Sequence, residues 1–78
     1  MPMTDADKGH AVMEAFRFFR LTTKERMTLR MLSAYFEEND LDLENMETGL
    51  NYTRLQGWTE YGPKQSSVLT DSGHRFLH

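Results

Sequence analysis

The chain has 78 residues and a formal net charge of −3, and this length has room for one core. It has no cysteine, which excludes disulfides, thiolate metal sites and cysteine nucleophiles. No apolar run approaches the roughly 20 residues of a membrane-spanning helix, and the polar, acidic start is unlike a signal peptide, so we expect a cytoplasmic protein. Acidic side chains outnumber basic ones by seven to six in residues 1–40 and by five to three in residues 41–78, so any nucleic-acid-binding surface must be local.

The first predicted element is a helix from Asp7 to Leu21, which follows a flexible N-terminus over residues 1–4 and opens a single domain over residues 5–78. Its apolar side chains recur at helical spacing and form a stripe wider than one core-facing surface needs. The surplus is aromatic and consists of Phe16, Phe18 and Phe19. These phenylalanines either cover the rest of the domain or contact the same helix of a second copy, and the second interpretation predicts a homodimer.

A second helix is predicted to begin at Thr22-Thr23-Lys24-Glu25. This spacing is typical of a capping box, in which the Thr22 hydroxyl accepts from the backbone N–H of Glu25 and the Glu25 carboxylate accepts from that of Thr22. The apolar pattern continues to Phe36, and the polar run over residues 37–40 ends it. The predicted helix therefore includes Arg26 and Arg30 on neighbouring turns.

A third helix follows, with Asp40 or Asp42 as its cap and Gly57 as the left-handed residue after its end. The apolar positions expected to face the core are Leu43, Met46, Leu50 and Leu55. The polar positions expected to point mostly outward are Glu44, Glu47, Thr48, Asn51 and Arg54.

After Gly57 the helical period gives way to alternation, which predicts one strand over residues 58–61 and another over residues 66–69. The segment Gly62-Pro63-Lys64-Gln65 has the composition of a turn between them. Two strands alone are marginally stable, so the hairpin must pack on the helices. Thr70 or Asp71 then caps a short closing helix that returns Phe76 and Leu77 to the core.

Two segments resemble winged-helix DNA-binding domains of the MarR-like and PadR-like regulators. One is Thr53-Arg54-Leu55-Gln56-Gly57-Trp58, which leads into the first strand, and the other is Leu69-Thr70-Asp71-Ser72-Gly73, which leaves the second. The resemblance covers about residues 22–78 and implies an α+β winged-helix fold: a three-helix core, a two-stranded hairpin wing and a short C-terminal helix. Here only about twenty residues separate the second helix from Trp58, so the usual pair of short helices before the wing is reduced to one, or to one plus a turn.

The function implied by this resemblance is that of a small transcriptional regulator that occupies a site on double-stranded DNA. The third helix would enter the major groove, where base edges and phosphates accept from polar side chains. The residues predicted to contact DNA are Thr48, Asn51 and Arg54 on this helix, Lys64 at the wing tip, and Arg26 and Arg30 on the second helix.

The alternative is a winged-helix adaptor that binds a protein and no DNA. The predicted recognition helix begins with Asp42, Glu44 and Glu47, and carboxylates repel the phosphates whose neutralisation supplies most DNA affinity. In this alternative Tyr52, Trp58 and Tyr61 are anchors for the partner, although we favour core packing for Trp58.

The sequence supports neither catalysis nor a cofactor. His10, His74 and His78 lie at the two ends of the chain without metal-ligand spacing, and we expect them to be surface or terminal residues. The serines lack the Gly-x-Ser-x-Gly setting of a nucleophile, and the five glycines are dispersed, with no phosphate-binding loop. We therefore predict no catalytic residues, no metal and no cofactor.

Overall fold

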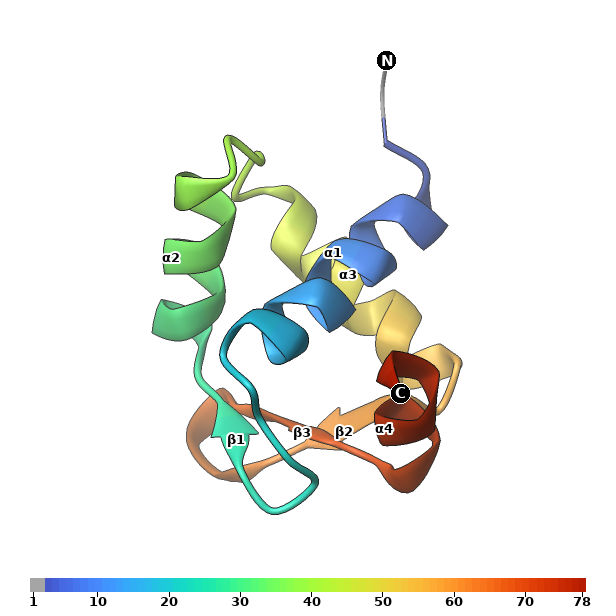
Figure 1. Ribbon diagram of the computed structural model, residues 1–78. Helices are drawn as coiled ribbons and strands as arrows, with labels where there is room; N and C mark the ends of the chain where they lie inside the picture. Colours follow the sequence, from blue (N-terminus) through green and yellow to red (C-terminus); the bar gives the residue numbers. More distant parts are fainter. Residues whose placement is uncertain (1–2) are drawn as a thin grey trace.

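The computed structural model describes residues 3–78 as an α+β domain. Its helices are α1 (Asp5–Phe18), α2 (Leu29–Glu38), α3 (Asn45–Leu55) and α4 (Asp71–Leu77). Its strands are β1 (Arg26–Met27), β2 (Thr59–Tyr61) and β3 (Ser67–Leu69), with a 3₁₀ turn, η1 (Pro63–Gln65), between β2 and β3. The strands form one antiparallel sheet in the order β1-β3-β2, which lies along the lower edge of Figure 1 with α1, α2 and α3 above it. The α+β class, the hairpin and the closing helix are confirmed.

The first helix begins two residues earlier than predicted because Thr4 caps it. The Thr4 hydroxyl accepts from the Asp7 N–H at 3.1 Å, and the Asp7 carboxylate accepts from the Thr4 N–H at 3.0 Å. This second bond is the main cause that lowers the pKa of Asp7 below its ordinary value. Of the predicted flexible terminus, Met1 and Pro2 lie outside the described residues.

The prediction that a helix begins at Thr22 is wrong. Glu25 does accept from the Thr22 N–H at 3.4 Å, but the Thr22 hydroxyl accepts from Lys24, and the chain then extends into β1. Pairing of β1 with β3 accompanies burial of the Met27 side chain in the core. Helix α2 starts only after Thr28, whose hydroxyl accepts from the Met31 N–H.

Three helices end in the same backbone motif, with one residue in the left-handed region. These residues are Arg20 (φ 56°) after α1, Asp40 (φ 56°) after α2 and Gly57 (φ 77°) after α3. In each case the next N–H donates back to a carbonyl in the last turn: Leu21 to Phe16, Leu41 to Phe36 and Trp58 to Thr53. The prediction for Gly57 is confirmed. The prediction that Asp40 or Asp42 caps α3 is wrong, because α3 has no side-chain cap and Asp40 closes α2.

Replacing Arg20 by glycine is expected to raise the free energy of unfolding by about 0.5–1 kcal/mol. The left-handed conformation costs an ordinary residue about 1–2 kcal/mol in the folded state, and glycine avoids this cost. Glycine also gives the unfolded chain more conformational freedom, which offsets part of the stabilisation. Urea denaturation measures the change. Arg20→Ala is the matched control, because it removes the side chain but keeps the Cβ; stabilisation by both variants would contradict the backbone explanation.

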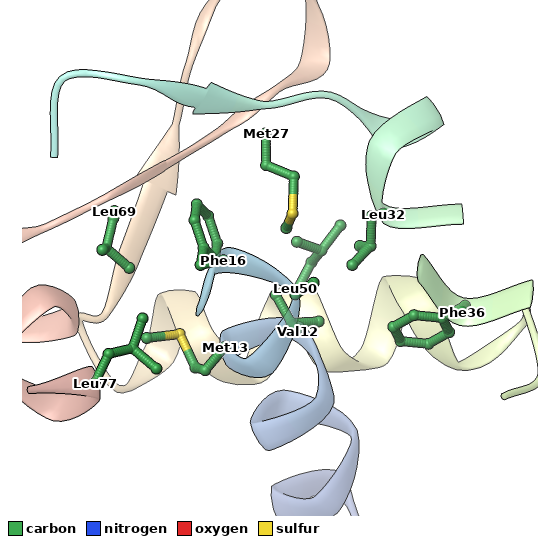
Figure 2. Close-up of a cluster of buried hydrophobic side chains, with 10 residues drawn as sticks. Val12, Met13, Phe16, Met27, Leu32, Phe36, Leu50, Leu69 and Leu77 are labelled. Carbon is green, nitrogen blue, oxygen red and sulfur yellow. The ribbon is translucent and has the colours of Figure 1, made fainter. Parts of the chain in front are cut away.

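The core lies where α1 crosses α3, between these helices and the sheet (Figure 2). Figure 2 shows Phe16 of α1 pointing toward the strands, with Leu69 and Met27 on either side, while Phe36 of α2 packs toward α3. Gly49, Leu50 and Thr53 form the buried face of α3. Leu43 and Leu55, which were expected in the core, are instead 45% and 84% exposed, because α3 turns the face carrying Gly49 and Thr53 toward α1 and β2.

The hairpin and α4 are fixed by threonines. The hydroxyls of Thr53 in α3 and Thr59 in β2 are buried and hydrogen-bonded at 2.8 Å, which joins the helix to the edge strand. Thr70 caps α4, as predicted, by accepting from the Gly73 N–H, and its hydroxyl donates to the Gly57 carbonyl. Leu77 returns to the core, whereas Phe76 stays 45% exposed. Over residues 3–78 no helix has the length and apolar character needed to span a membrane.

Candidate functional site

A groove of about 470 Å³ lies between the start of α2, helix α3 and the hairpin, three elements that can be followed in Figure 1. We call it the α3 groove. Its apolar walls are Leu29, Leu43, Met46, Leu50 and Tyr61, and its polar lining is Glu44, Glu47, Arg54 and Gln65. Its volume falls within the range of about 300–1,000 Å³ that is typical of ligand-binding clefts.

The walls of the groove expose large apolar side chains. Leu29 is 44% exposed, Leu43 is 45% exposed and Tyr61 is 72% exposed. Each lies at an end of an element: Leu29 is the first residue of α2, Leu43 precedes α3 and Tyr61 ends β2. Because all three border one concavity, they form a shared apolar surface, and such surfaces mark interaction sites.

Arg54 is held by contacts within the chain. Its guanidinium carbon lies 3.7 Å from the centre of the Tyr61 ring, a cation–π contact. Its Nη1 donates to the Asn51 side-chain oxygen at 3.3 Å, and its Nη2 lies 3.5 Å from the Ser67 hydroxyl. Its Nε is buried and has no hydrogen-bond partner among residues 3–78. The sequence prediction of a mostly outward Arg54 is therefore wrong: the side chain is half-buried and lies against the hairpin.

The two carboxylates of the groove stand at the other end of α3. Glu44 and Glu47 are exposed and three positions apart, a spacing that places side chains on the same side of a helix. The one ion pair in the described part of the chain joins Arg17 and Glu14, so neither carboxylate is paired there. Their position at the α3 N-terminus suits the helix dipole.

The remaining residues predicted to contact DNA are dispersed. Thr48 is half-buried, while Asn51, Lys64 and Arg30 are exposed. Lys64 lies in η1 at the hairpin tip with φ 55°. Arg30 is in α2 but Arg26 is in β1, so the prediction that both occupy one helix is wrong.

Strand register separates Arg26 from the α3 groove. Arg26 pairs with Val68, which also pairs with Glu60, so these three side chains lie on one face of the sheet. Tyr61 and Ser67, which contact Arg54, belong to the opposite face. The predicted phosphate contact from Arg26 beside α3 therefore has no support in the geometry.

The phenylalanines proposed for the dimer have three different environments. Phe16 is fully buried in the core of its own chain, so it cannot form part of a surface contact without unfolding. Phe19 is half-buried, and Phe18 is 56% exposed with its ring 5.0 Å from that of Phe19 and 5.4 Å from that of Tyr35. The predicted dimer contact is thus reduced to Phe18 and the exposed part of Phe19.

Trp58 packs inside an aromatic cluster, as favoured from the sequence. Its ring lies 4.2 Å from that of Phe76 and nearly parallel to it, and Tyr52 contacts it edge-on at 5.9 Å. His10 stacks on Phe76 at 5.6 Å. Of the three aromatic residues suggested as anchors for a partner, only Tyr61 is exposed.

A second cavity, of about 480 Å³, lies between the end of α1 and α4. Phe16, Leu21 and Leu77 supply its apolar lining, and Arg17, Arg20, His74 and His78 supply its basic lining. The Arg17 guanidinium spans it by donating to the Leu77 carbonyl at 3.2 Å, so it ties α1 to the closing helix. In the described residues no three His, Asp or Glu side chains converge as metal ligands would.

Comparison of the chain with protein-family models, curated proteins and solved structures finds no match. The chemistry of the α3 groove is therefore the observation that bears most directly on function.

Proposed function

We propose that this chain is a winged-helix domain that acts by binding another protein, without catalysis. The order of elements supports the fold: α3 leads through the Gly57 turn into the β2–η1–β3 hairpin, and α4 closes the domain. In the resemblance seen from the sequence, α3 corresponds to the recognition helix and the hairpin to the wing. The groove between them is where such a domain would meet its partner.

The observation that carries the choice of a protein partner is the chemistry of that groove. Its walls are apolar, and the exposed charged side chains in its lining are those of Glu44 and Glu47. Arg54, the one cation of α3, is bound to Tyr61 and Asn51. Duplex DNA is bound chiefly by cations that neutralise phosphates, whereas proteins are bound through concave apolar surfaces with polar rims. The groove suits the second kind of partner.

DNA binding is the second candidate, and the exposure of Arg30 and Lys64 favours it. Both are free of ion pairs in the described part of the chain. Arg30 follows Leu29 and Lys64 precedes Gln65, two residues that line the groove. These two cations beside the groove would supply a weak contact with phosphates.

Binding to random duplex DNA at low and moderate salt tests the choice between these functions. We expect no salt-dependent binding, because two unpaired carboxylates accompany two cations beside α3. The measurement is fluorescence anisotropy of a labelled duplex, with a basic DNA-binding protein as positive control. Binding that falls steeply between about 50 and 200 mM salt, and that an Arg30→Ala, Lys64→Ala double variant abolishes, would establish DNA binding instead.

A further inference from the structure

We propose that the α3 groove binds a basic amphipathic segment of a partner protein. Large apolar side chains of the segment occupy the groove, and its Lys or Arg residues lie beside Glu44 and Glu47. This inference rests on the protein-binding function proposed above and specifies the chemistry of the partner.

The apolar part of the inference follows from the shape and lining of the groove. Leu29 and Leu43 each leave nearly half of their surface exposed while bordering the same concavity. One inserted apolar side chain therefore buries surface on both, together with the exposed ring of Tyr61. Peptide recognition by grooves of this kind uses apolar anchors spaced on one face of a segment. The pocket between α2, α3 and the hairpin provides the matching receptor.

The charge of the segment follows from the distribution of charges around the groove. At the α3 N-terminal end, Glu44 and Glu47 are exposed and without ion-pair partners over residues 3–78. At the hairpin end, Arg54 is stacked on Tyr61 and hydrogen-bonded to Asn51, so its guanidinium is held against the hairpin. A cation of the segment gains two partners at the first end, whereas a carboxylate there meets two like charges. Such complementarity selects partners and increases association rates.

Two synthetic helical peptides with the same apolar positions test the proposal, one with Lys and the other with Glu at the polar positions. The readout is the set of backbone amide signals of the isotope-labelled protein during titration. We expect the Lys peptide to shift the signals of Leu29, Leu43, Glu47 and Tyr61. We expect the Glu peptide to bind at least about tenfold more weakly because of charge repulsion.

Charge-neutral variants isolate the two carboxylates. Glu44→Gln with Glu47→Gln is expected to weaken binding of the Lys peptide roughly fivefold and to reduce its salt dependence. Glu37→Gln with Glu38→Gln is the matched control, because it changes the net charge equally at the exposed end of α2, outside the groove lining. Unchanged amide spectra of the unbound variants show that the fold is retained.

The other outcomes each overturn a definite statement. Equal shifts by the two peptides leave protein binding in place and overturn the basic segment. If neither peptide shifts the groove signals at millimolar concentration, both the protein-binding function and the basic segment are overturned. If groove signals shift when only the protein concentration is raised, the occupant is a second copy of the chain, and the proposal is overturned. The segment of that copy would be the one around Phe18, which is exposed and lies between Arg17 and Arg20 in the sequence.

Discussion

Replacing Phe16 by alanine is expected to lower the free energy of unfolding by about 3–5 kcal/mol. Phe16 is fully buried, and its ring lies between α1 and the sheet, with Met27 and Leu69 on either side (Figure 2). Alanine loses the transfer free energy of the ring and leaves a cavity that three different elements would have to fill together. A domain of this length has a free energy of unfolding of about 4–12 kcal/mol, so this loss is a large share of the total.

Urea denaturation monitored by circular dichroism measures this loss of free energy of unfolding. Phe18→Ala is the matched control. Phe18 belongs to the same helix but is 56% exposed, so its replacement is expected to cost about 1 kcal/mol or less. Equal losses in the two variants would contradict the assignment of Phe16 to the core.

The same control tests the predicted dimer, because a dimer built on the α1 aromatics should dissociate in Phe18→Ala. A monomeric solution mass of the unmodified protein at high concentration would remove the dimer prediction altogether.

The hairpin and the closing helix were predictable because their signals are local. Gly57 marks the end of α3, Gly62-Pro63 marks a turn, and Thr70 precedes a helix that it can cap. Each of these residues determines backbone geometry within a few positions of itself. Tertiary contacts then act in the same direction as the local preference.

Strand β1 was not predictable for the opposite reason. It has two residues, too few to show alternation, and it follows Thr22–Glu25, which has the spacing of a capping box. The segment pairs with the sheet, and Met27 then packs in the core. This burial depends on β3, which lies some forty residues later in the chain. Arg20 and Asp40 likewise gave no signal of their left-handed backbone, since glycine is the residue expected there.

The α3 groove could not be predicted from the sequence either, although most of its residues had been singled out. Glu47 and Arg54 were assigned correctly to one helix, and Glu44 lies just before its start, but the apolar walls come from α2, α3 and the hairpin together. Leu43 was expected in the core because its spacing fits the helix period, which does not tell whether a neighbouring element covers that position. The contact of Arg54 with Tyr61 depends on how the hairpin lies on α3, and it changes a predicted DNA contact into a fixed part of the groove wall.

Replacing Gly49 by alanine is expected to destabilise the domain by about 2–3 kcal/mol, although alanine is the better helix former by about 1 kcal/mol. Gly49 is buried in α3 where α1 crosses it. A Cβ at this position would lie 2.6 Å from the Lys8 carbonyl oxygen and 2.9 Å from the Val12 Cγ2. The valine can rotate, but the carbonyl belongs to the backbone of α1, so relief of the contact requires the two helices to separate.

Asn51→Ala is the control for helix propensity, since Asn51 is exposed on the same helix. It is expected to change the free energy of unfolding by no more than about 0.5 kcal/mol. Thermal or urea denaturation of both variants gives the comparison, and equal stabilities would show that α1 and α3 do not approach as closely as the glycine implies. Because α3 carries the groove carboxylates, separation of the two helices also moves Glu44 and Glu47 relative to Leu29 on α2. Gly49→Ala is therefore expected to weaken binding of the Lys peptide as well.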